Sequence, residues 1–248
     1  MQPSTLLSKK SIIPTDRLIL ALDVPNPTAA RRLVDSLGDT VCFYKIGLEI
    51  FMSGGYFELI DWLRARDKKV FVDLKFFDVP ETVRRAVCQL KPYDITFTTV
   101  HGNDAILKSA VEAALEIGGN FGILAVTALT SLDQADLNDL GFSCDFKSLV
   151  LSRARRAIEI GCCGVISSGL EAADLRISLG RELLIVTPGI RPVLNRTVDD
   201  QKRIVNVEKA FLNGADYIVI GRPIWQAPDP QLAAATIQKQ IVQLFMNL

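Results

Sequence analysis

The segment Val70-Phe-Val-Asp-Leu-Lys-Phe-Phe-Asp-Val-Pro-Glu-Thr-Val83 joins an apolar strand to the first turn of a helix. β-Branched and aromatic residues predict a buried strand over residues 70–74, and the proline that follows is typical of a helix start. Because strand side chains alternate, Asp73 and Lys75 should point to the same face, with Asp78 on a short turn beyond them. Three charges so close to an apolar strand are costly unless they are paired. Taken alone, the motif fits a structural ion pair as well as a functional site.

The same strand-then-helix pattern recurs along the chain. Apolar runs predict strands over residues 18–23, 41–46, 70–74, 94–100, 121–127, 164–167, 183–187 and 216–220. Helical periodicity and capping residues predict helices over residues 27–37, 56–66, 80–90, 104–117, 146–160, from about 170, 199–213 and 230–248. Between residues 131 and 146 we expect a polar loop.

Eight strand–helix units in a chain of 248 residues predict an α/β protein with the (β/α)8 TIM barrel fold. A doubly wound open sheet is the alternative, but no G-x-G-x-x-G follows the first strand and the units number eight. No linker or low-complexity segment divides the chain, so we expect a single domain over residues 1–248.

Composition excludes several classes of function. Lys+Arg and Asp+Glu both number 28. This balance does not indicate a basic surface that binds nucleic acid, nor a net positive charge that would attract a membrane surface. The five cysteines are an odd set without C-x-x-C, and His101 is the one histidine, which argues against disulfide, zinc and most Ser-His-Asp sites. The N-terminus has too short an apolar core for a signal peptide, and no run is long enough to span a membrane. We expect a cytoplasmic protein with reduced thiols.

Polar residues gather where the expected strands end, which is where barrels of this fold place catalysis. These residues are Asp23, Lys45, Asp73, Lys75, His101, Thr130, Arg191 and Arg222. Lysines and aspartates of the first three strands would face basic groups on the last two. The loops after the seventh and eighth strands commonly bind phosphate in this fold. Here each of these loops contains a glycine (Gly189, Gly221) close to an arginine, which can donate two hydrogen bonds to phosphate. The sequence therefore predicts a phosphate site, with structural arginines at the barrel mouth as the alternative.

Three other features leave their alternatives open. The long polar segment 192–202 is typical of a lid, and Gln201 in it could reach the phosphate or be solvated. Thr130 and Ser131 suit hydrogen bonding to a flat polar ring, or capping of a helix. His101 is compatible with catalysis or with holding a neighbouring loop.

Seven motifs, in chain order, resemble the orotidine 5′-phosphate decarboxylase family in its bacterial form. They are Leu-Asp23-Val-Pro, Lys45-Ile-Gly, Asp73-Leu-Lys75-Phe-Phe-Asp78-Val-Pro-Glu-Thr82, Val-His101-Gly, Leu-Thr130-Ser, Thr-Pro188-Gly-Ile-Arg191-Pro and Gly221-Arg222-Pro-Ile. D-x-K-x-x-D alone belongs to a wider superfamily, and Lys45 with the phosphate-loop motifs makes the resemblance specific. The chain departs from the family pattern at Thr98-Thr99, where an asparagine is expected near Thr98.

The resemblance implies decarboxylation of orotidine 5′-monophosphate to uridine 5′-monophosphate in de novo pyrimidine biosynthesis, without metal or cofactor. It also implies a homodimer with shared active sites. Lys75 would donate the proton to C6, and Asp73, beside the departing carboxylate, would hold Lys75 in place together with Lys45. Asp78 and Thr82 would reach into the neighbouring subunit's site. Asp23 and Lys45 would bind the ribose, and Thr130 and Ser131 the pyrimidine. The residues implied around the phosphate are Pro188, Arg191, Gln201, Gly221 and Arg222.

The chemistry of the residues agrees with this reading, and two rivals remain. Loss of carbon dioxide leaves an in-plane electron pair at C6, which an ammonium held between carboxylates can stabilise. Magnesium-dependent ketogulonate-phosphate decarboxylases and hexulose-phosphate synthases share the barrel, but they need an acidic ligand where Lys45 stands. A phosphate- or nucleotide-binding barrel without turnover would need the arginines but not the charge array.

Overall fold

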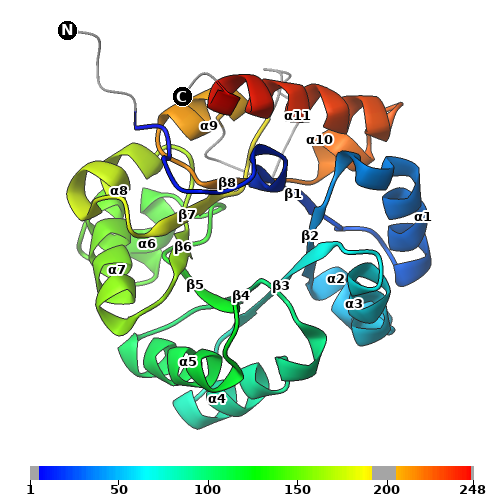
Figure 1. Cartoon of the computed structure of the whole chain (residues 1–248). Coiled ribbons are helices and arrows are strands. Elements are labelled where there is room, and N and C mark those ends of the chain that lie inside the picture. Colours follow the sequence, from blue (N-terminus) through cyan, green and yellow to red (C-terminus); the bar gives the residue numbers. More distant parts are fainter. Residues whose placement is uncertain (1–5, 192–204, 247–248) are drawn as a thin grey trace, which may run out of the picture.

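The computed structural model describes residues 6–191 and 205–246 and forms a closed barrel of eight parallel strands ringed by helices (Figure 1). The strands are β1 (Leu18–Ala21), β2 (Phe43–Gly47), β3 (Lys69–Phe76), β4 (Phe97–Val100), β5 (Gly122–Val126), β6 (Gly164–Ile166), β7 (Leu184–Thr187) and β8 (Tyr217–Ile220). Pairing of β1 with β8, from Leu18 opposite Ile218 to Leu20 opposite Ile220, closes the ring. The predicted TIM barrel is confirmed, and one domain over residues 1–248 stays a prediction.

Helices follow every strand. Those that cover the barrel are α1 (Pro27–Leu37), α3 (Tyr56–Arg64), α4 (Pro80–Cys88), α5 (Asp104–Ile117), α7 (Phe146–Ile160), α8 (Ala172–Leu179), α9 (Val207–Leu212) and α11 (Pro230–Met246). Shorter elements are α2 (Leu48–Ser53), α6 (Gln134–Asp139), α10 (Arg222–Trp225) and the 3₁₀ turns η1 (Pro14–Arg17), η2 (Gly38–Thr40) and η3 (Lys91–Tyr93). Predicted caps are observed: the side chains of Asn26 and Asn103 accept from the backbone N–H groups of Ala29 and Ile106.

The barrel interior is filled by its own apolar core, which forms the floor of the site. Its buried members are Ile19, Ala21, Phe43, Phe71, Phe97, Leu124, Val126, Ile166, Val186 and Val219. Because side chains alternate along a strand, Phe71 in this core is followed inward by Asp73 one layer higher. The sequence thus changes from apolar to charged along one interior face, and the charged layer meets the barrel mouth.

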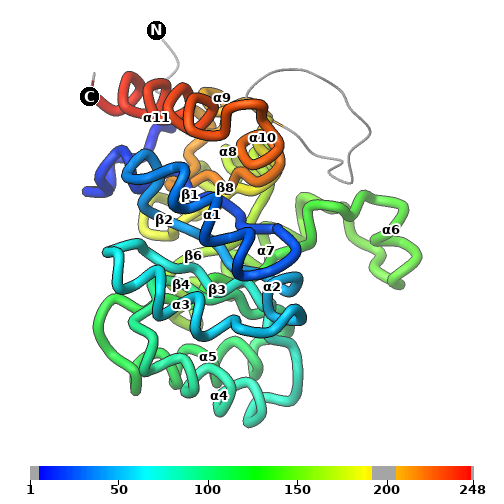
Figure 2. The backbone as a smooth tube through the Cα atoms, turned by 90° about the vertical axis from the view of Figure 1, so that its right-hand side faces the viewer, coloured from blue at the N-terminus to red at the C-terminus, as the bar shows by residue number. Residues whose placement is uncertain are grey.

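Three local expectations differ from the structure. The expected loop before α7 contains α6, which begins with a capping box between Asp133 and Asp136 and projects from the barrel at the right of Figure 2. The helix expected over 199–213 was wrong at its start, because Val205 bridges Ile190 and Asn206 caps a helix that begins one residue later. Residues 199–204 lie outside the described residues. β3 runs on to residue 76, past its expected end, with an irregular register.

Candidate functional site

A cavity of about 450 Å³ opens at the carboxyl ends of the strands. It is lined by eleven of the residues that the sequence singles out, namely Asp23, Lys45, Asp73, Lys75, Thr130, Ser131, Pro188, Gly189, Arg191, Gly221 and Arg222. Loops after β1, β5, β7 and β8 and the strands β2 and β3 themselves bring these side chains together. The predicted gathering of polar groups at this end of the barrel is therefore observed.

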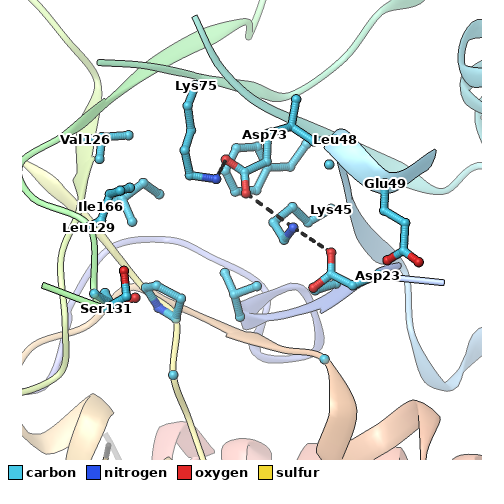
Figure 3. Close-up of a pocket in the computed structure, with 18 of the residues that line it drawn as sticks. Asp23, Lys45, Leu48, Glu49, Asp73, Lys75, Val126, Leu129, Ser131 and Ile166 are labelled. Carbon is cyan, nitrogen blue, oxygen red and sulfur yellow. Dashed lines mark hydrogen bonds and ion pairs between the residues drawn. The ribbon is translucent and has the colours of Figure 1, made fainter. Parts of the chain in front are cut away.

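Asp73 is the centre of a chain of alternating charges (Figure 3). Its two carboxylate oxygens contact the Nζ atoms of Lys75 at 2.9 Å and Lys45 at 3.2 Å. Lys45 Nζ in turn contacts Asp23 Oδ1 at 3.1 Å. The Asp73 side chain is 11% exposed and that of Lys75 is 36% exposed, so a ligand in the cavity can reach the Lys75 ammonium while Asp73 stays largely dry.

The ion pairs shift the pKa values of Asp73 and Lys45 more than burial does. Burial by itself raises the pKa of Asp73, but the charges of Lys45 and Lys75 and hydrogen bonds from Lys75 and Thr99 bring it down to about 2. Burial likewise lowers the pKa of Lys45, yet the charges of Asp73 and Asp23 leave it above its usual value. Asp73 and Lys45 are therefore both charged at neutral pH, and the array presents fixed charges to the cavity.

Two backbone features accompany the placement of Lys75 and Lys45 beside Asp73. Lys75 has a left-handed φ of 49° near the carboxyl end of β3, and its Nζ contacts Asp73. A β-carbon on Gly47 would lie 3.3 Å from Lys45 Nζ, so the glycine of the Lys45-Ile-Gly47 motif leaves room for that ammonium. The sequence indicated the pairing of Asp73 with Lys75 but gave no sign of this backbone turn.

Two arginines also line the cavity. Arg191 follows β7 after Gly189, whose φ of 76° lies in the left-handed region that favours glycine. Arg222 opens α10, directly after Gly221. Arginines that line a cavity can bind an anionic group with charge-assisted hydrogen bonds. Gln201, expected beside them, lies outside the described residues.

Comparison with known proteins identifies the family. Residues 16–237 match the model of the Orotidine 5'-phosphate decarboxylase / HUMPS family. The chain belongs to this family. An orotidine 5'-phosphate decarboxylase of Methylococcus capsulatus is 62% identical over 239 residues, covering 96% of this chain and 97% of the relative. One of Stenotrophomonas maltophilia is 47% identical over 226 residues, covering 91% of this chain and 92% of the relative.

A solved structure agrees with this membership. The crystal structure of orotidine 5'-phosphate decarboxylase from Lactobacillus acidophilus matches with a TM-score of 0.80 and 35% identity, covering 91% of this chain and 99% of that one. The resemblance recognised from the motifs is therefore confirmed, together with the fold that it implied.

Asp78, Thr82 and His101, which the sequence also singles out, do not line this cavity. Asp78 and Thr82 are exposed, and the Asp78 carboxylate accepts a hydrogen bond from the backbone N–H of Val79 at 2.6 Å. His101 packs edge-on against Phe77, and burial, with the charges of Arg153 and Lys75, lowers its pKa. This placement favours the local structural reading of His101.

Two residues near the site were missed by sequence reasoning. Glu49 lines the cavity from α2, a helix of six residues that is too short to give a periodic signal. Thr99 donates a hydrogen bond to Asp73 from β4, and only the register between β3 and β4 brings the two together.

Within residues 6–191 and 205–246, no group of three or more His, Cys, Asp or Glu side chains could hold a metal ion. None of the helices in the described ranges has the length and apolar character needed to cross a bilayer.

Proposed function

We propose that this protein decarboxylates orotidine 5′-monophosphate to uridine 5′-monophosphate, a step of pyrimidine biosynthesis, without a metal or cofactor. The observation that carries the proposal is the largely buried Asp73 carboxylate held between the Lys45 and Lys75 ammonium groups at the edge of an open cavity. The names of the similar proteins support the same substrate.

In the proposed reaction, the bond between C6 and the carboxylate carbon breaks, carbon dioxide leaves and the electron pair stays on C6. That pair lies in the plane of the ring, where the π system cannot delocalise it, so its stabilisation must be electrostatic. The Lys75 ammonium provides a fixed positive charge at this point and then gives its proton to C6. Asp73 holds the ammonium and lies beside the departing carboxylate. Solvent afterwards restores the proton to the Lys75 amine.

The other lining residues bind the parts of the substrate that do not react. We assign Asp23 and Lys45 to the ribose hydroxyls and Thr130 with Ser131 to the pyrimidine edge. Arg191, Arg222 and the backbone at Gly221 hold the phosphate, with Pro188 beside them and Gln201 as a further donor. Because phosphate is remote from C6, its binding energy can hold the ring in place for the reaction.

Orotidine 5′-monophosphate itself provides the direct test. Mixed with the purified protein, it should lose the ultraviolet absorbance of its carboxylated pyrimidine, and uridine 5′-monophosphate should accumulate. Binding without any change in absorbance would favour the non-enzymatic nucleotide-binding barrel. Turnover of a sugar phosphate instead would favour the magnesium-dependent relatives.

We further propose a homodimer in which each site receives Asp78 and Thr82 from the other subunit. Both residues are exposed and outside the cavity of their own chain. Asp78 is flanked by Phe77 and Val79, which are 66% and 63% exposed. These apolar side chains on either side of Asp78 would be buried if a partner subunit covered this turn. A cytoplasmic location stays a prediction, supported by the five free cysteines.

Activity should survive exhaustive treatment with EDTA. The reason is electrostatic: the Lys45 ammonium already occupies the space between the Asp23 and Asp73 carboxylates, so a divalent ion there would be repelled. Initial rates before and after chelation, with and without added magnesium, measure this. Loss of decarboxylation on chelation and recovery with magnesium would contradict the metal-free mechanism.

Arg222→Ala should lower kcat/KM by roughly 30- to 1,000-fold, or about 2 to 4 kcal/mol, because charge-assisted contacts to phosphate are lost. Added guanidinium ion should restore part of the rate, since the chemistry at Lys75 is untouched. Arg32→Ala, on the exposed outer side of α1, is the matched control and should keep the wild-type rate. An unchanged kcat/KM in Arg222→Ala would remove Arg222 from the phosphate site.

A further inference from the structure

Thr99 is a fully buried hydroxyl in contact with both halves of the Asp73–Lys75 pair. Its Oγ1 donates to Asp73 Oδ1 at 2.8 Å. The same Oγ1 accepts from the backbone N–H of Lys75 at 3.0 Å. Since a hydroxyl has one proton, the bond accepted from Lys75 leaves that proton for Asp73, and the two contacts fix the hydroxyl's direction.

The register of β3 against β4 explains why a side chain is needed there. Phe71 and Val72 pair regularly with Phe97 and Thr98, but the next pair joins residues 76 and 100. Four steps along β3 thus match two steps along β4, which is a bulge that contains Asp73 and Lys75. Within this bulge the Lys75 N–H donates to the Thr99 hydroxyl, and the residue takes its left-handed φ of 49°.

We propose that Thr99 is a positioning residue, whose hydroxyl sets the backbone turn at Lys75 and the orientation of the Asp73 carboxylate, so that the ammonium faces C6. This inference rests on the proposed decarboxylation and adds a residue to it. Asp73 Oδ1 accepts from Lys75 Nζ as well as from Thr99, so the hydroxyl and the ammonium are tied to the same oxygen. Without the hydroxyl, the Lys75 N–H would lose its partner and the bulge could relax toward regular strand, which would move Nζ.

Thr98 offers a matched control for the competing idea that Thr99 merely stabilises the fold. It is the adjacent residue, is equally buried, and donates from Oγ1 to the backbone carbonyl of Val72 at 2.9 Å. Because side chains alternate, it faces away from the cavity. Thr98→Val and Thr99→Val therefore make the same chemical change: each replaces a buried hydroxyl that donates one hydrogen bond with a methyl group. Only Thr99→Val removes contacts to Asp73 and Lys75.

The experiment compares Thr99→Val, Thr99→Ser and Thr98→Val by kcat and KM for orotidine 5′-monophosphate and by amide hydrogen exchange at Lys75. Thr99→Val should lower kcat roughly 10- to 100-fold, the effect of a small misplacement of a reacting group, while KM changes less than about 3-fold. Thr99→Ser and Thr98→Val should stay within about 3-fold of wild type in kcat. Exchange at Lys75 should accelerate in Thr99→Val alone.

Each other result overturns the inference. A wild-type kcat and slow Lys75 exchange in Thr99→Val would show that the hydroxyl is dispensable. An equal loss in Thr99→Ser or Thr98→Val would show that size or stability, not the hydroxyl, matters. If Thr99→Val does not fold, Thr99→Cys takes its place with the same expectation, since a thiol is a weak donor and acceptor. The assay of the wild-type protein tests the proposed decarboxylation by itself. Amide exchange at Lys75 tests the role of Thr99 even if the protein has no such activity.

Discussion

Lys75→Ala is expected to leave the barrel folded and to lower turnover of orotidine 5′-monophosphate by at least about 10⁴-fold. The variant loses both the positive charge that stabilises the electron pair at C6 and the proton that ends the reaction. The fold should survive because Lys75 is partly exposed at the barrel mouth, and because Asp73 keeps its contact with Lys45 at 3.2 Å. Steady-state rates and thermal unfolding of the purified variant measure the two effects.

Lys69→Ala is the matched control for this result. Lys69 lies on the same strand, at its other end, and also forms an ion pair, with Asp16 at 2.6 Å. Its replacement should lower stability slightly and leave turnover unchanged, because the apolar interior core separates it from the cavity. Turnover near wild type in a folded Lys75→Ala protein would remove Lys75 from its proposed role, and a comparable loss in Lys69→Ala would indicate a general effect of altered charge.

Local patterns were sufficient to predict the barrel because each of its units carries its own signal. Strands β5 and β8 are continuous apolar runs, and the helices that follow strands have apolar stripes with caps such as Asn26 and Asn103. Once the barrel is predicted, the position of the site follows, because parallel strands in a closed barrel bring all their carboxyl ends to one rim. Polar residues at strand ends therefore had to meet, and eight of those that the sequence singles out line one cavity.

Features that depend on contacts between distant segments could not be predicted in this way. The bulge in β3 exists because of its register with β4, so the roles of Thr99 and of the left-handed Lys75 have no signature in the local sequence. The start of α6 does carry a local signal, the capping box between Asp133 and Asp136, but the helix is only six residues long and its segment is polar, so composition alone predicts a loop. Whether Asp78 serves its own chain or a partner is a question about a second chain, and one sequence does not answer it.

Mixing two inactive variants should answer that question by restoring activity. Lys75→Ala and Asp78→Ala are each expected to be nearly inactive, since every site in either homodimer lacks one group. If Asp78 crosses the interface, a mixed dimer has one site that lacks both groups and one site that lacks neither. Random exchange makes about half of the dimers mixed, so about a quarter of all sites should be complete. Decarboxylation rates measured during subunit exchange should therefore rise to roughly a quarter of the wild-type value.

Lys75→Ala mixed with Asp73→Ala provides the control for this complementation. Asp73 and Lys75 contact each other at 2.9 Å within one chain, so each site of a mixed dimer still lacks one of them. Their mixture should stay inactive, although its subunits exchange in the same way. Exchange itself is followed with differently tagged chains, so that a failure to mix is recognised. If exchange is complete and Lys75→Ala with Asp78→Ala gains no activity, Asp78 serves its own chain and the shared-site proposal is wrong.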